Sequence, residues 1–402
     1  MVVDTKGFLL CLRYTLHIKK NVDIKNLNLL TTYFDLDWGT SSSFNHTNIL
    51  LQSSAARPHQ LKDPSIRSYH TKYISSLDTP LELNPLFITG FTDGEGSFSL
   101  SIRDIDKNTK KARVLYVFSI VLHKKDEGIL KSIQSSLGIG KIYTQGKIYT
   151  QGKEGIQFRV ESKKELLILI EHFDKYPLIT KKSKDFLCFK KAIFLIKNKK
   201  HLTKQGLLKL VSLKALMGKG LTNELKAAFP DILPANELGI SDLTLSLAKA
   251  PDLIIDPCWL AGFISAEGCF IIGIYKSTSV KIGYQVQLKF VLTQHLRDKE
   301  LFEYFVKYLG YGYTAVNREG VDFIVTKYSD LKDKLLPLLH LQHPVVGYKY
   351  LDYLYFMEAV EIMQKKLHLT EEGLNKLREI QVLMNSGRKN TPSQDTDSAT
   401  TD

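Results

Sequence analysis

The sequence has few cysteines and no long apolar segment. Its four cysteines lie far apart and form no C-x-x-C pair, which argues against a disulfide scaffold or a structural zinc site. No apolar run reaches the roughly 18 residues that a membrane-spanning helix requires. The hydrophobic fraction of 44% and the charged fraction of 24% are ordinary globular values, so the composition also excludes a wholly disordered or fibrous chain.

Acidic residues are the other deficit of this sequence. The chain has 42 Asp and Glu against 55 Lys and Arg, which gives its 402 residues a net charge of +13. A basic balance of this size suggests a polyanionic partner, most simply nucleic acid. At roughly 100–200 residues per domain, the length leaves room for two or three domains.

The two ends of the chain differ in composition from its middle. Residues 1–80 contain polar clusters and little sustained periodicity, so we interpret them as a poorly ordered N-terminal extension outside the folded core. Residues 389–402 are rich in Ser, Thr and Asp and predict a disordered tail.

The middle of the chain is a tandem repeat. Short motifs recur at an offset of 172 residues, which falls to 165–167 further along each half. The clearest pairs are Gly90-Phe91 with Gly262-Phe263, Glu95-Gly96 with Glu267-Gly268, and Lys182 with Lys349. So regular a shift indicates a duplication. We therefore predict a first lobe at 81–235, an inter-lobe linker at 236–252 and a second lobe at 253–388.

Each repeat predicts an α+β unit. Asn84 and Asp256 are favourable N-caps, and each precedes a proline at the first helical position. The segment Ser97–Ile102 alternates polar and apolar residues, which is typical of a half-buried strand, and later apolar segments have helical spacing. Each half should therefore contain a helix, strands and further helices, with one polar face on its sheet.

The first helix of each repeat carries a pair of small residues four positions apart. These residues are Gly90 and Gly94 in the first repeat, and Gly262 and Ala266 in the second. Such pairs lie on one helix face and allow another helix to approach closely, so they predict a helix interface.

Glu95 and Glu267 follow these small residues in the last helical turn. A carboxylate there faces the negative end of the helix dipole, at a cost of about 0.3–1 kcal/mol. If the two helices pack together, the carboxylates also repel each other. A bound divalent cation would offset both costs, and Mg²⁺ often takes one or two carboxylates together with phosphate oxygens. The alternative is an incidental surface glutamate, which is harder to accept at two matching repeat positions.

Two nonapeptides of this sequence resemble a known family. Ile88–Gly96 and Leu260–Gly268 resemble the two signatures of a single-chain LAGLIDADG homing endonuclease, within a resemblance that covers about residues 84–388, and the flanks resemble the fungal mitochondrial intron-encoded type. The resemblance implies two pseudo-symmetric αββαββα lobes, packed through their signature helices, with saddle-shaped antiparallel sheets for DNA. It implies that Glu95 and Glu267 bind the catalytic metals, assisted by the backbone carbonyls of Gly94 and Ala266.

The resemblance also implies roles for residues outside the signatures. Lys182 and Lys349 would lie beside the scissile phosphates, where a cation can stabilise developing negative charge or polarise a water. The alternative is a solvated surface lysine. Gln294 would position a water, and because its counterpart is Leu122, the two halves would be chemically unequal. Ser265 replaces the acid that Asp93 retains, which we expect to affect capping more than chemistry.

Polar side chains that alternate along the predicted strands form a hypothesis for DNA contact. Arg and Lys can pair with guanine and Gln with adenine at major-groove edges. The candidates are Ser99, Ser101, Arg103, Arg159, Gln285, Gln287 and Lys289. A solvated strand face is the alternative for each residue taken alone.

A further peculiarity is the hexapeptide Lys141–Gly146, which is immediately repeated as Lys147–Gly152 and indicates a duplicated hairpin tip.

Together these features favour one function over two others. The leading hypothesis is a monomeric, Mg²⁺-dependent endonuclease of the mitochondrion, which cuts both strands of a long asymmetric DNA site and initiates intron mobility. One alternative is an RNA maturase that assists splicing of its host intron RNA on the same fold. The other is a non-catalytic DNA-binding regulator, which the intact Glu95 and Glu267 argue against.

Overall fold

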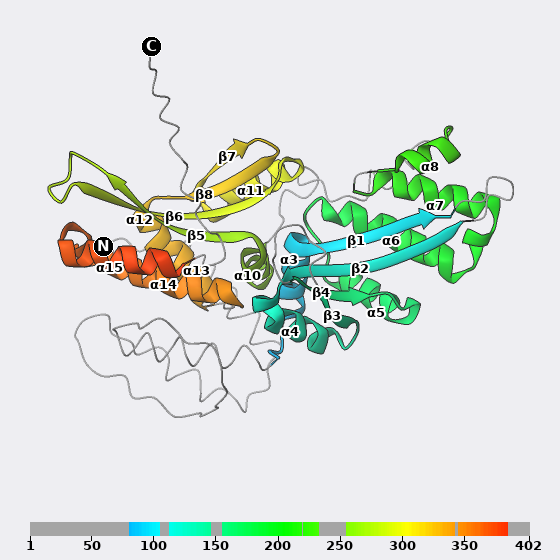
Figure 1. Cartoon of the computed structure of the whole chain (residues 1–402), viewed down its shortest axis with the longest axis horizontal. Coiled ribbons are helices and arrows are strands. Elements are labelled where there is room, and N and C mark those ends of the chain that lie inside the picture. Colours follow the sequence, from blue (N-terminus) through cyan, green and yellow to red (C-terminus); the bar gives the residue numbers. More distant parts are fainter. Residues whose placement is uncertain are drawn as a thin grey trace, which may run out of the picture. The chain divides into compact units, whose positions relative to one another are not determined.

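The computed structural model describes residues 80–104, 112–145, 155–218, 220–232, 255–341 and 345–384 (Figure 1). The predicted extension lies outside these residues except for Pro80, and the predicted linker and tail lie wholly outside them. Of the duplicated hexapeptide, only Lys141–Gln145 is described. In the part of the chain that the structure describes, no helix has the length and apolar character needed to cross a bilayer.

The first lobe alternates helices and strands in the predicted order. Its elements are α3 (Pro85–Glu95), β1 (Gly96–Arg103), β2 (Arg113–His123), α4 (Glu127–Leu137), β3 (Lys141–Gln145), β4 (Gly155–Val160), α5 (Lys163–Lys175), α6 (Lys182–Lys197), α7 (Lys204–Leu216) and α8 (Asn223–Ala228).

The second lobe repeats this order. Its elements are α10 (Pro257–Glu267), β5 (Gly268–Lys276), β6 (Tyr284–His295), α11 (Lys299–Leu309), β7 (Tyr313–Asn317), β8 (Gly320–Val325), α12 (Tyr328–Asp330), the π-helix η7 (Leu331–Leu335), α13 (Leu336–Leu341), α14 (Tyr348–Gln364) and α15 (Glu371–Leu383). The short 3-10 helices η3 (Lys124–Asp126), η4 (Lys200–Leu202), η6 (Leu296–Asp298) and η8 (Leu367–Leu369) join neighbouring elements.

Each lobe contains one antiparallel four-stranded sheet. The strand orders are β1-β2-β4-β3 and β5-β6-β8-β7, so the two sheets have the same topology. The predicted α+β fold of two similar lobes is therefore confirmed.

One face of each sheet is apolar and is covered by helices of its own lobe. Phe98 of β1 packs against Phe173 of α5 and Phe189 of α6, with ring centroids 5.7 and 5.5 Å away. Phe270 of β5 packs in the same way against Phe356 of α14, at 5.2 Å. Side chains alternate across a strand, so the residues next to each phenylalanine point to the opposite face. That face is polar along β1, with Ser97 and Ser99, but it carries Cys269 and Ile271 along β5.

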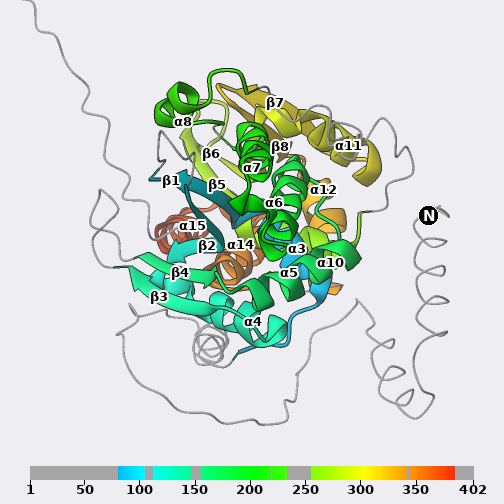
Figure 2. The same cartoon turned by 90° about the vertical axis from the view of Figure 1, so that its right-hand side faces the viewer.

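The helices α3 and α10 lie side by side between the two lobes (Figures 1 and 2). A Cβ atom added at Gly90 would lie 1.9 Å from the carbonyl oxygen of Trp259, and one at Gly262 would lie 2.1 Å from that of Phe87. A Cβ at Gly94 would lie 2.4 Å from Cβ of Ala266. The structure thus places all four small residues between the two helices.

Candidate active site at the helix junction

Glu95 and Glu267 end the two packed helices, and both side chains are half-buried. The last turn of α3 contacts Glu267, because a Cβ at Gly94 would lie 3.1 Å from its Cγ and 3.5 Å from its Oε1. Burial, and next the repulsion by Glu267, raise the pKa of Glu95 to about 7. Burial also raises the pKa of Glu267. The structure therefore brings the two predicted carboxylates together at an electrostatic cost.

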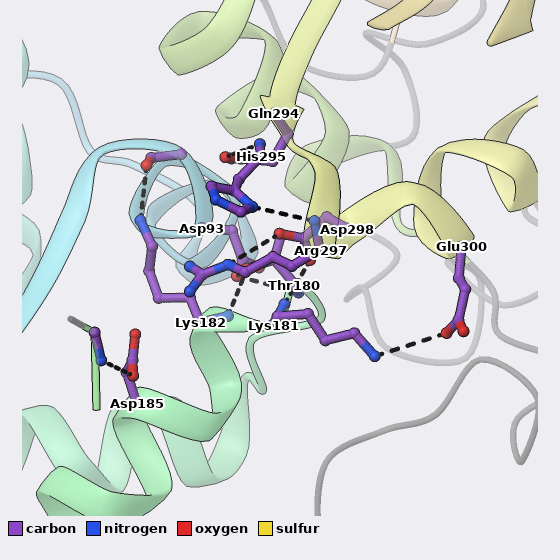
Figure 3. Close-up of polar contacts among 12 residues, drawn as sticks. Asp93, Thr180, Lys181, Lys182, Asp185, Gln294, His295, Arg297, Asp298 and Glu300 are labelled. Carbon is purple, nitrogen blue, oxygen red and sulfur yellow. Dashed lines mark hydrogen bonds and ion pairs between the residues drawn. The ribbon is translucent and has the colours of Figure 1, made fainter. Parts of the chain in front are cut away.

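Two lysines supply positive charge beside these carboxylates. Nζ of Lys182, at the start of α6, donates hydrogen bonds to the carbonyl oxygens of Thr92 at 2.9 Å and Gly94 at 2.7 Å (Figure 3). Burial lowers the pKa of Lys182, although the neighbouring Asp93, Glu267 and Glu95 act in the opposite direction. Lys349, near the start of α14, lines a cavity of about 430 Å³ together with Glu95. The structure thus brings both predicted lysines to the carboxylate pair.

Gln294 differs from its counterpart in the first lobe. Its Nε2 lies 3.4 Å from Oε1 of Glu267, and its Oε1 accepts the backbone N–H of His295 at 2.9 Å (Figure 3). Leu122 lines the cavity beside Glu95 and has no group that can form such a bond. The surroundings of the two carboxylates are therefore unequal, as the sequence implies.

The donor set at this junction fits a hard divalent cation. Within the described residues no group of three or more His, Cys, Asp and Glu side chains could hold a metal ion. The site instead offers the carboxylates of Glu95 and Glu267 and the carbonyl of Gly94, which accepts the ammonium of Lys182 and so already interacts with a cation. Two carboxylates and a carbonyl leave room for water and phosphate oxygens, which is the coordination that Mg²⁺ prefers.

The candidate DNA-contacting residues lie on the polar faces of the two sheets. Ser97, Ser119 and Arg159 are opposite one another across β1, β2 and β4, which places Arg159 on the same face as Ser99, Ser101 and Arg103. Arg159 also forms an ion pair with Glu161.

On the second sheet, Gln285 and Gln287 are exposed and Lys289 is half-buried, and all three lie on one face of β6. The pairing of the strands places further residues on these faces. They could not be predicted, because the sequence does not show which residues of neighbouring strands lie opposite one another. Arg113 and Lys141 pair with Arg103 and Arg159. Three exposed tyrosines share these faces, namely Tyr143, Tyr275 and Tyr313.

Asp93 and Ser265 both bond a distant segment, and Ser265 also donates to the carbonyl oxygen of Ala261 in its own helix, at 2.8 Å. The buried carboxylate of Asp93 accepts the N–H of Ile179 at 3.0 Å and Nε1–H of Trp259 at 2.9 Å. Burial raises the pKa of Asp93 to about 6. Ser265 Oγ accepts the N–H of Val346 at 3.1 Å. Ile179 and Val346 each precede a lysine of the site by three residues, so both signature helices hold the segment that leads to a lysine.

Glu95→Gln should stabilise the metal-free protein at alkaline pH. The pKa of Glu95 is raised from 4.5 to about 7 in the folded state, so its stabilising contribution, present below pH 4.5, is lost as the pH rises to about 7. Above about pH 7 the ionised side chain destabilises the fold by up to about 3 kcal/mol, at about 1.4 kcal/mol per pKa unit. Urea unfolding with EDTA at pH 5 and pH 8 should show a gain for the variant that is several times larger at pH 8 than at pH 5. The exposed Glu171→Gln is the control, and equal pH dependence of wild type and Glu95→Gln would contradict this electrostatic account.

The fold and site define a duplicated protein whose equivalent helices place their terminal glutamates at the lobe junction. The family model for LAGLIDADG endonuclease matches residues 88–193 and 260–360, one segment in each lobe. The chain therefore belongs to this family as a double-motif member, and the resemblance noted in its sequence is confirmed.

Relatives and solved structures agree with this placement. Probable intron-encoded endonuclease 3 of Neurospora crassa is 34% identical over 320 residues, which are 79% of this chain and 57% of that protein. The chain thus spans little more than half the length of this relative.

The structure of the I-SmaMI LAGLIDADG homing endonuclease bound to cleaved DNA has 40% identity and a TM-score of 0.68, over 76% of this chain and 98% of its own. I-AabMI bound to uncleaved DNA has 43% identity and a TM-score of 0.67, over 76% and 100%. I-SmaMI bound to an uncleaved DNA target in the presence of calcium ions has 38% identity and a TM-score of 0.67, over 75% and 99%.

Proposed function

We propose that this protein is a site-specific, divalent-metal-dependent endonuclease that cuts both strands of a long asymmetric DNA site. The observation that carries the proposal is the pairing of Glu95 and Glu267 at the ends of the packed helices, with Lys182 bonded to the adjacent carbonyl. The DNA-bound structures of I-SmaMI and I-AabMI, each similar over nearly its whole length, support it.

The residues at the junction would divide the work of phosphodiester hydrolysis. Mg²⁺ held by Glu95 and Glu267, with the carbonyls of Gly94 and Ala266, would supply an activated water and neutralise charge at the phosphate. Each glutamate would serve one strand. Lys182 and Lys349 place a cation where negative charge develops, which stabilises the transition state. Gln294, bonded to Glu267, would orient a water at one of the two sites only.

The biological setting follows from the names of similar proteins. Relatives include proteins named for an ND4 intron of Podospora anserina and for a Cox1 intron of Schizosaccharomyces pombe. These names support an intron-encoded protein of the mitochondrion, and we propose that it acts as a monomer on duplex DNA and initiates movement of its own intron.

The direct test uses the intronless allele of the gene whose intron encodes this protein. Purified protein with Mg²⁺ should cut that duplex at one position and leave the intron-containing allele intact, because an intron inserted in the target site separates its halves. The matched control is the Glu95→Gln, Glu267→Gln double variant. A wild-type protein that binds the site but never cuts it in Mg²⁺ would leave DNA binding alone as the function.

Gln287→Ala should relax sequence preference and not general affinity. Because Gln285 and Gln287 share one strand face, their effects should fall on neighbouring base pairs, at about 1–3 kcal/mol for each lost base contact. A cleavage profile over a library of target variants measures this, with the exposed Gln205→Ala on α7 as the control. An unchanged cleavage profile would place β6 outside the DNA interface.

The affinity of the wild-type protein for DNA should fall as salt is added. A plot of log affinity against log salt concentration should be linear, with a slope of about −0.9 for each phosphate contact.

A further inference from the structure

The two helices that carry the site lysines have N-cap residues whose own side chains make no cap bond, although Thr180 Oγ1 accepts the N–H of Lys182 at 3.2 Å. The first N–H groups of any helix need acceptors from outside the helix. At the N-cap positions of α7 and α15, Thr203 and Thr370 supply such an acceptor from their own side chains. Among the described residues, the N-cap positions of α6 and α14, Lys181 and Gly347, make no side-chain cap bond.

Each of these helix starts receives one further acceptor from the opposite lobe. Oδ1 of Asp298 in the second lobe accepts the backbone N–H of Lys181 in the first, at 2.6 Å (Figure 3). Oδ1 of Asp126 in the first lobe accepts the backbone N–H of Tyr348 in the second, at 3.2 Å. The aspartates are 172 residues apart and the amides 167 apart, which are the offsets of the internal repeat. The same bond is therefore made twice, in opposite directions between the lobes.

Both aspartates lie where a 3-10 turn continues into an α-helix, Asp126 before α4 and Asp298 before α11. The turns begin at His123 and His295, whose Nδ1 atoms already accept the N–H two residues further on. In the described part of the chain neither aspartate makes a cap bond to its own helix. Each carboxylate instead bonds the start of a helix in the other lobe. Because the same bond is made at both repeat positions, it points to a specific use of these side chains.

The bonded amides adjoin the lysines of the candidate active site. Lys181 directly precedes Lys182, and Tyr348 directly precedes Lys349. Resting on the proposed nuclease function, we propose that Asp126 and Asp298 are positioning residues that form a reciprocal inter-lobe clasp. Asp298 fixes the start of α6 and thereby Lys182, and Asp126 fixes the start of α14 and thereby Lys349.

The clasp makes the geometry of each lysine depend on both lobes. Within its own lobe, each lysine-bearing segment is held by the signature helix, through Asp93 or Ser265. The clasp adds a bond from the other lobe at the adjoining residue. Docking of the two lobes thus adds a constraint to each lysine beyond the contacts within its own lobe, which links the rate of cleavage to the assembled junction.

The two halves of the clasp are unequal. Asp298 is 2% exposed, and Nε of Arg297 lies 3.6 Å from its Oδ2. Asp126 is half-buried and its bond is longer. Buried charge-assisted bonds are the stronger ones, so loss of Asp298 should have the larger effect.

Strand-resolved cleavage tests the clasp, with a different fluorophore on each strand of the target. Asp298→Ala should slow one strand by about tenfold, equal to about 1.4 kcal/mol in the barrier, and it should slow the same strand as Lys182→Ala does. Asp126→Ala should slow cleavage of the other strand by about threefold, and this should be the strand that Lys349→Ala slows. Asparagine keeps the acceptor oxygen, so Asp298→Asn and Asp126→Asn should restore most of the rate. The Asp298→Ala and Lys182→Ala effects should be non-additive in the double variant.

Hydrogen exchange provides a readout that does not need cleavage. Asp298→Ala should increase exchange in peptides that contain the Lys181 amide, and Asp126→Ala in those that contain the Tyr348 amide. The exposed Asp231→Ala is the control and should change neither. Unchanged exchange in both variants would overturn the clasp, and so would equal slowing of both strands. If wild-type protein does not cut DNA, the nuclease proposal fails, and the exchange experiment alone decides whether the clasp exists.

Discussion

Replacing Glu95 or Glu267 with glutamine should abolish double-strand cleavage while leaving DNA binding in Ca²⁺ largely intact. Glutamine keeps the size of the side chain but removes the charge that a divalent cation requires. The expected loss is more than about a hundredfold, because even residues that only support a metal ligand are typically worth about 10–100-fold. Cleavage of a target labelled on both strands measures the effect, and fluorescence anisotropy in Ca²⁺ measures binding.

The control for this experiment is Glu171→Gln, an exposed glutamate of α5. It should cut at the wild-type rate. Full cleavage by either Glu95→Gln or Glu267→Gln would remove that carboxylate from the site, while loss of binding in Ca²⁺ would mean that the substitution disturbs the fold and not the chemistry.

Gly262→Leu should destabilise the protein severely and eliminate cleavage with it. A Cβ alone would lie 2.1 Å from the carbonyl oxygen of Phe87, so any side chain must push α10 away from α3. Overpacking a core usually costs about 1–3 kcal/mol of stability. The cost here should be at the upper end of this range or above it, because the added side chain meets a helix backbone, which cannot move aside as a side chain can. Because both glutamates end these helices, the displacement also moves the carboxylates. Gly90→Leu should behave alike, since its Cβ would lie 1.9 Å from the carbonyl oxygen of Trp259.

Thermal unfolding and strand cleavage together measure this second effect. Gly320→Ala is the control, because its Cβ would lie 3.3 Å or more from its neighbours on an ordinary strand backbone. A Gly262→Leu protein that unfolds at the wild-type temperature and cuts normally would mean that the helices need not approach so closely.

Much of this architecture could be predicted because the chain repeats itself. The repeat offset located both signature helices, and the small residues at Gly90 and Gly262 indicated the faces that meet. Alternation along Ser97–Ile102 identified β1 and its polar face. These are local or periodic signals, and a single sequence contains them.

The contacts between distant segments could not be predicted in this way. Asp93 bonds a segment 86 residues away, and Asp126 bonds Tyr348 across 222 residues. Nothing in the spacing shows that an aspartate at an N-cap position will turn toward another helix. The repeat did contain a signal, since Asp126 and Asp298 recur at the offset of the signatures. Strand register was equally hidden, which is why Arg113 and Lys141 were not selected.

The contact of α3 with α10 also determines which part of this molecule can be exchanged. Where a glycine meets a backbone carbonyl, no single new side chain can remodel the junction, because the constraint lies in the main chain. Surface residues of a sheet face carry no such constraint. Recombination between related proteins should therefore succeed with half-molecules, provided that each donated half brings its whole signature helix and the aspartate that reaches across. Evolution by swapping halves would then yield new combinations of DNA half-sites without rebuilding the junction that joins them.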